Sequence, residues 1–160
     1  MPAAVFDEVE AFARALPARG ALVGLDLGTK TIGVAVSDVT RLVATPLETI
    51  RRVKFTPDVE RLESIMAERD IVGVVIGLPL NMDDSEGPRA QSTRAFVREF
   101  AKRISAPFCF WDERLSTDWS HDHLIAQGMK SPTARAEVID RVAASHILQG
   151  ALDRMRALKV

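Results

Sequence analysis

Two adjacent apolar segments, residues 21–28 and 31–38, constrain the fold of this chain more than any other feature. Both alternate with a period of two residues, which is typical of β-strands. The two residues between them predict an antiparallel hairpin in which Asp26 lies opposite Gly33. One face of this hairpin is bulky, and the other carries only Gly24, Asp26, Gly33, Ala35 and Ser37. A face of small side chains lets a helix or a ligand approach closely.

The rest of the chain alternates between predicted strands and helices. Further strands are expected at 43–50, 71–77 and 107–111, and helices at 6–16, 57–69, 89–104, 116–128 and 133–158. Three consecutive strands favour an antiparallel meander, whereas strands that are reached through helices favour parallel pairing. We therefore predict an α/β fold whose mixed five-stranded sheet has three antiparallel strands and then two parallel strands, with helices on both faces.

The composition is that of a folded domain. The chain has 160 residues, of which 47% are hydrophobic and 27% are charged, so it can bury a core. We predict one domain over 1–160, with 1–20 as a short N-terminal helical extension. The N-terminus is acidic, the only cysteine, Cys109, is predicted to be a core residue, and no apolar run reaches about 20 residues. These features predict a cytoplasmic protein without membrane association.

Carboxylates in apolar surroundings are the strongest indication of a functional site. Asp26 lies inside the first apolar strand, and Asp112-Glu113 follows the strand at 107–111, at the edge where open α/β sheets bind ligands. Asp140 lies beside the apolar stripe of the last helix. Each acid also has a purely structural interpretation: backbone donors for Asp26, a solvated helix cap for the pair, and a basic neighbour for Asp140.

Acids that meet at one point repel each other and acquire raised pKa values. A divalent cation removes that repulsion, and Mg²⁺ prefers oxygen ligands and is held by few carboxylates. Two such ions about 4 Å apart can activate a water molecule and stabilise the leaving oxygen of a phosphodiester. If the three acidic positions converge, the sequence favours metal-assisted phosphodiester hydrolysis.

Four segments in the same order resemble the YqgF/RuvX family, whose members are RuvC-like proteins of the ribonuclease H-like superfamily. The segments are GLDLGTKTIGVAVSD at 24–38, VIGLPLNMD at 75–83, WDERLST at 111–117 and EVIDRVAASHILQ at 137–149. The similarity covers roughly residues 21–155. It implies a ribonuclease H-like fold and a nuclease of the kind associated with pre-16S rRNA or with Holliday junctions.

The resemblance also assigns roles to individual residues. It implies that Asp26, Glu113 and Asp140 are the catalytic acids that hold Mg²⁺ or Mn²⁺, with Asp112 as a further candidate ligand. Adjacent residues of a strand face opposite ways, so only one of Asp112 and Glu113 should point inward. Arg114 would orient a carboxylate or a phosphate.

The hairpin turn and the last helix show how this chain differs from related proteins. Lys30 lies in the turn beside Asp26, where it would contact a substrate phosphate. Thr31 follows it where the family commonly has arginine. Ala143 occupies the position at which RuvC resolvases carry a second helix acid, so full equivalence to a resolvase does not follow.

Basic side chains elsewhere supply further candidate phosphate contacts. One group is the four-residue-spaced stripe Arg94, Arg98 and Lys102, and the other is the short cluster Arg51, Arg52 and Lys54. Either group could contact a nucleic-acid backbone, and the alternative is a solvated surface. The net charge of −1 adds no support, because nucleic-acid-binding domains are usually basic.

Three functions fit these features. The first is a Mg²⁺- or Mn²⁺-dependent endonuclease acting on structured RNA, in 5′-end maturation of pre-16S rRNA. The second is a resolvase of branched DNA, which would use the same site and would need a homodimer for two-fold cleavage. The third is a non-catalytic factor that binds RNA or ribosomal particles, which the single helix acid favours. The sequence leaves open whether the protein is a monomer or a homodimer.

Overall fold

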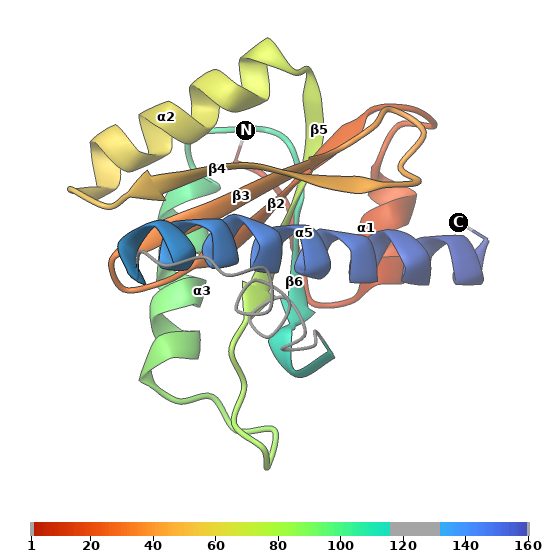
Figure 1. Ribbon diagram of the computed structural model, residues 1–160. Helices are drawn as coiled ribbons and strands as arrows, with labels where there is room; N and C mark the ends of the chain where they lie inside the picture. Colours follow the sequence, from red (N-terminus) through yellow and green to blue (C-terminus); the bar gives the residue numbers. More distant parts are fainter. Residues whose placement is uncertain (1, 116–131, 160) are drawn as a thin grey trace.

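Six strands form one mixed sheet in the computed structural model, which describes residues 2–115 and 132–159. The strands are β1 (Val5–Phe6), β2 (Ala21–Leu27), β3 (Thr31–Ser37), β4 (Ala44–Arg51), β5 (Ile71–Leu78) and β6 (Phe108–Asp112). Their order across the sheet is β1-β6-β5-β2-β3-β4 (Figure 1). β2, β3 and β4 form an antiparallel meander, and the other neighbours are parallel. The predicted mixed α/β sheet is confirmed.

The strand β1 was not expected, because the sequence predicts five strands and a helix over 6–16. The helix α1 (Val9–Ala15) is shorter, and β1 precedes it as an edge strand paired in parallel with β6. A strand of two residues is too short to show a periodicity of its own. Phe12 of α1 is completely buried. The N-terminal segment therefore contributes an edge strand to the sheet and a buried side chain to the core.

Helices cover both faces of the sheet, as predicted. α2 (Phe55–Glu68) and α3 (Pro88–Phe100) pack on one face, and α1 and α5 (Pro132–Leu158) pack on the other (Figure 1). The predicted helix at 116–128 lies outside the described residues. Cys109 is completely buried, which confirms its assignment to the core. No helix in the described part of the chain is both long and apolar enough to cross a membrane.

The β2–β3 hairpin has the register that its alternating pattern predicts. Asp26 lies opposite Gly33, and the N–H of Gly28 donates to the carbonyl of Thr31 at 2.8 Å, which closes a turn of two residues. The bulky face packs against the core under α2 and α3. The small face receives α5 so closely that a Cβ atom at Gly24 would lie 2.6 Å from the Cβ of Leu148. The lack of side-chain bulk therefore determines where α5 lies.

Candidate active site

The three predicted acids come from different elements and meet where the parallel strands end. Asp26 is near the end of β2, Glu113 starts a short 3-10 helix (Glu113–Leu115) after β6, and Asp140 lies on α5. A Cβ atom at Gly33 would collide with the carbonyl of Asp140, and Gly33 lies opposite Asp26. This contact holds the helix acid next to the strand acid. Asp26 interacts electrostatically with both Glu113 and Asp140.

The surroundings of Asp26 raise its pKa to about 8. Burial is the largest cause, followed by the negative charge of Glu113 and a hydrogen bond with its side chain, and then by the charge of Asp140. Arg89 acts in the opposite direction. A hydrogen bond between two carboxyl groups needs a proton, and Asp26, with its pKa raised to about 8, carries that proton near neutral pH in the metal-free protein. A bound cation would take the place of that proton.

The oxygen atoms of this cluster fit a hard divalent cation. Oε1 of Glu113 is buried, and no N–H group or alcohol in the described part of the chain donates to it. An unsatisfied buried carboxylate oxygen is costly, and a cation would satisfy it. Among residues 2–115 and 132–159, no group of three or more His, Cys, Asp or Glu side chains is placed so that it could hold a metal ion together. Mg²⁺ needs only one or two direct carboxylates, and Asp26 and Glu113 can supply them.

Asp140 is held by a residue whose role the sequence did not indicate. The hydroxyl of Thr31 donates to Oδ2 of Asp140 at 2.6 Å. In the sequence Thr31 is only a departure from the arginine common in similar proteins. The structure shows that the hydroxyl fixes the orientation of the helix acid.

Gly77 in β5 makes room for Glu113. A Cβ atom at this position would lie 2.6 Å from Oε1 of Glu113 and 2.8 Å from its Cγ. These distances are too short for any side chain, so the glycine is required for the observed position of Glu113. Sequence reasoning missed this role because Gly77 ends an apolar run that a buried strand already explains.

Asp112 points away from the acid cluster. Its carboxylate accepts hydrogen bonds from Nε of Arg114 at 3.0 Å and from Nη2 at 2.7 Å, and these contacts lower the pKa of Asp112. Arg114 also pairs with Asp84 at 2.6 Å and donates to the carbonyl of Asn81 at 3.0 Å. Arg114 thus orients one carboxylate and ties the loop 79–87 to the end of β6. Of the two adjacent acids, Glu113 faces the cluster.

The predicted basic stripe on α3 is largely engaged within the protein. Arg94 forms ion pairs with Asp7 at 3.0 Å and with Glu86 at 2.7 Å. Lys102 forms an ion pair with Glu99 at 2.9 Å. Arg98 has no ion pair with a described residue. Arg94 therefore joins the N-terminal segment to the loop before α3. Contact between this stripe and a substrate stays a prediction.

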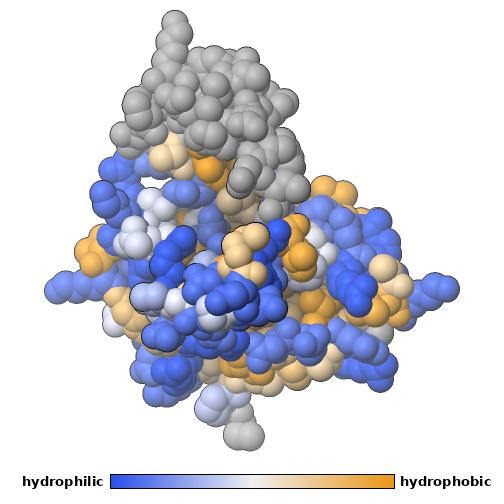
Figure 2. All heavy atoms as spheres, turned by 90° about the horizontal axis from the view of Figure 1, so that it is seen from below, coloured by the Kyte–Doolittle hydropathy of each residue, from blue (hydrophilic) through white to orange (hydrophobic). Residues whose placement is uncertain are grey.

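The surface around the acid edge is polar. Lys30 is exposed in the β2–β3 turn and forms no ion pair with a described residue. Figure 2 views the molecule from the side toward which the loop 79–87 projects in Figure 1, and hydrophilic residues dominate the visible surface. Apolar residues are scattered among them. Such a surface fits a charged ligand better than an apolar partner.

Comparisons with known proteins identify the family of this chain. The family described as "RuvX: Holliday junction resolvase" matches residues 20–154. A relative from Cereibacter sphaeroides is 60% identical over 151 residues, which cover 94% of each chain. A relative from Paracoccus denitrificans is 59% identical over 154 residues, which cover 96% of this chain and 97% of the relative. Both carry the name "Putative pre-16S rRNA nuclease".

Solved structures show a similar fold. T. thermophilus RuvC in complex with a Holliday junction substrate has a TM-score of 0.50 and a sequence identity of 16%. The alignment covers 86% of this chain and 96% of that chain. The similarity concerns the fold alone, and it confirms the predicted ribonuclease H-like architecture.

Proposed function

Because this chain belongs to the RuvX family, we propose that it is a nuclease that hydrolyses phosphodiester bonds with the help of Mg²⁺ or Mn²⁺. The observation that carries the proposal is the close approach of Asp26 and Glu113 at the end of the parallel strands, with a buried Oε1 of Glu113 that has no hydrogen-bond partner in the described part of the chain. With Asp140 beside them, we assign these acids as metal ligands and catalytic residues.

The protein prepares this site through rigid placement of its acids. Burial desolvates Asp26, Gly77 leaves the space that Glu113 occupies, and Thr31 orients Asp140. Bound there, a divalent cation would lower the pKa of a water molecule and stabilise the leaving oxygen. Asp26 and Glu113 would hold the cation, and Lys30 contacts a phosphate of the substrate.

We propose structured RNA as the substrate, in 5′-end maturation of pre-16S rRNA. The names of the relatives from C. sphaeroides and P. denitrificans support this choice. Branched DNA is the second candidate, because the description of the matching family names Holliday junctions. Both substrates would be cleaved at the same acids, so substrate preference has to be measured directly.

Replacing Glu113 with Gln is expected to lower the rate of cleavage by at least about 1,000-fold, since it removes a direct ligand. The matched change Asp112→Asn alters the adjacent acid, which faces Arg114, and is expected to retain the rate within about threefold. The assay compares a 5′-extended 16S rRNA fragment with a four-way DNA junction, in Mg²⁺, in Mn²⁺ and in EDTA. Equal losses in the two variants, or wild-type cleavage in EDTA, would contradict the assignment.

Thr31→Val is expected to slow cleavage about tenfold, because Asp140 loses the hydrogen bond that orients it. The change should also raise the Mg²⁺ concentration needed for half-maximal rate, which a purely structural role would not do. Thr31→Ser keeps the hydroxyl and should restore both values. If Ser fails to rescue the Mg²⁺ dependence, the hydrogen bond is not what positions Asp140.

A further inference from the structure

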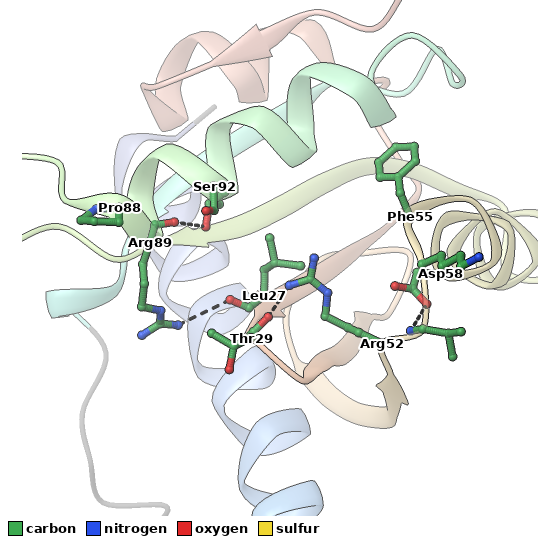
Figure 3. Close-up of a pocket in the computed structure, with 12 residues that line it drawn as sticks. Leu27, Thr29, Arg52, Phe55, Asp58, Pro88, Arg89 and Ser92 are labelled. Carbon is green, nitrogen blue, oxygen red and sulfur yellow. Dashed lines mark hydrogen bonds between the residues drawn. The ribbon is translucent and has the colours of Figure 1, made fainter.

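A cavity of about 570 Å³ lies beside the acid cluster, between the β2–β3 turn and the first turns of α2 and α3 (Figure 3). Three basic side chains line it: Arg52, Lys54 and Arg89. We propose that this cavity binds one nucleotide of the substrate strand next to the cleaved bond, with its phosphate on the two arginines and its base on the apolar wall.

The two arginines are held in place and still have free donors. Arg52 donates to the carbonyl of Gly28, and Nη2 of Arg89 donates to the carbonyl of Leu27 at 3.5 Å. In Figure 3 the two side chains reach the β2–β3 turn from opposite sides. A guanidinium group has five N–H donors, so each arginine keeps most of them for a ligand. Phosphate is the anion that such paired forks bind best.

The basic side chains of this cavity form no close ion pair in the described part of the chain, although Asp58 shares the lining and Arg89 acts on Asp26 at longer range. Neither Arg52, Lys54 nor Arg89 forms an ion pair with a described residue. Neighbouring arginines behave differently: Arg51 pairs with a glutamate of α5, and Arg94 pairs with two acids. Like charges around one cavity repel each other, and a bound anion would relieve that repulsion.

The size and the walls of the cavity favour a nucleotide over a free phosphate. A volume of about 570 Å³ lies in the range of pockets that bind small organic ligands. Its apolar lining consists of Leu27, Val53, Phe55 and Pro88. Val53 is 77% exposed, although a valine is normally covered, so an unpaired base would find apolar surface to cover there.

An acidic residue in the lining determines which way round a nucleotide would bind. Asp58 also lines the cavity, and its Oδ1 accepts the backbone N–H of Val53 at 3.1 Å. Figure 3 places Asp58 on the opposite side of the cavity from Arg89. A carboxylate repels phosphate but accepts hydrogen bonds from the N–H groups of a base. The phosphate therefore belongs at the Arg89 side and the base at the Asp58 side.

The cavity lies close to the acid cluster at the end of β2. Leu27 and Gly28, which form part of its lining, directly follow Asp26 in the chain. The charge of Arg89 acts on Asp26, so the two side chains are within electrostatic reach. A phosphate on Arg89 would therefore neighbour the phosphate at the acids. This placement beside the cleaved bond rests on the proposed function, whereas nucleotide binding itself does not.

The test is a binding titration of the full chain in EDTA, in which NMR chemical shifts report binding. The probes are adenosine 5′-monophosphate, uridine 5′-monophosphate, the two nucleosides and inorganic phosphate. The nucleotides are expected to bind at least about tenfold more tightly than the nucleosides or phosphate. Arg52→Ala and Lys54→Ala should each weaken nucleotide binding, by about tenfold for the arginine. Arg69→Ala, an exposed arginine just after α2 and outside the cavity, should leave it unchanged.

Several outcomes would overturn the proposal. Unchanged nucleotide affinity in both Arg52→Ala and Lys54→Ala would do so, and so would inorganic phosphate that binds as tightly as the nucleotides. Thermal unfolding of each variant shows whether it is folded, and Lys54→Ala removes no described side-chain hydrogen bond. Nucleotide binding without any cleavage would count against the proposed function alone. Cleavage with unaffected cavity variants would count against the cavity alone.

Discussion

Asp26→Asn is expected to abolish cleavage and, at the same time, to stabilise the metal-free protein. Cleavage should fall by at least about 1,000-fold, because the central acid of the cluster is lost. Stability should rise because Asp26 is buried beside Glu113 and Asp140, which together raise its pKa to about 8. An amide of the same shape carries no charge and removes that repulsion.

The gain in stability should depend on pH in a defined direction. The pKa of Asp26 rises from 3.8 to about 8, so between these values the unfolded chain has released a proton that the folded chain retains. Each pH unit in this window lowers the free energy of unfolding of the wild type by up to about 1.4 kcal/mol. The free energy of unfolding of Asp26→Asn does not decrease in this way, because asparagine does not titrate. Its advantage should therefore be absent below pH 4 and should be largest above pH 8.

Thermal unfolding in EDTA at pH 4, 6 and 8 measures this difference. At pH 8 we expect a gain on the order of 2 kcal/mol, or about 4–8 °C in Tm. Asp112→Asn is the matched control with the opposite sign, because the pKa of Asp112 is lowered by Arg114. That variant should lose stability above the ordinary pKa of an aspartate. A Tm of Asp26→Asn at or below that of the wild type at pH 8 would contradict the buried-acid interpretation.

The sequence predicts the parts of this fold that depend on periodicity. Alternation places Asp26 opposite Gly33, and the same alternation separates a bulky face from a small face. Because only one face lacks bulk, the position of α5 follows, and with it the position of Asp140. The approach of Asp140 to the strand that carries Asp26 could thus be anticipated from the strand register and the stripe of one helix.

Contacts between residues far apart in the chain could not be anticipated in the same way. The hydroxyl of Thr31 donates to Asp140, which is 109 residues further along the sequence. The need for a glycine at position 77 comes from the side chain of Glu113, which occupies the space that a Cβ atom would take. Helical spacing on α3 suggested a free stripe, but Arg94 is neutralised by Asp7 from the N-terminal segment. Periodicity identifies faces, and it contains no information about which partner neutralises a charge.

The distribution of charge is more informative than its sum. A net charge of −1 gives no support to nucleic-acid binding. The structure nevertheless groups Arg52, Lys54 and Arg89, which form no ion pair with a described residue, around the cavity beside α2 and α3, and Arg89 lies within electrostatic reach of Asp26. Binding of a divalent cation by the acids would make this whole edge more positive. Substrate binding should therefore depend on both the metal and these local cations.

Of the glycine-to-alanine substitutions in this chain, Gly33→Ala is expected to cause the largest loss of stability. A Cβ atom at Gly33 would collide with the backbone carbonyl of Asp140, which cannot rotate away as a side chain can. Either α5 moves off the hairpin or β3 distorts. We expect a loss of about 3 kcal/mol or more, which corresponds to a decrease of about 6–12 °C in Tm.

Gly87→Ala is the matched control, because the nearest side-chain atom to a Cβ there would be 3.4 Å away. It should change the free energy of unfolding by less than about 1 kcal/mol. If Gly33→Ala folds, a displaced α5 would carry Asp140 away from Asp26, so cleavage should fall together with stability. Unfolding by urea and the Mg²⁺ dependence of cleavage measure the two effects. A Gly33→Ala variant as stable and active as Gly87→Ala would show that α5 does not depend on the small face for its position.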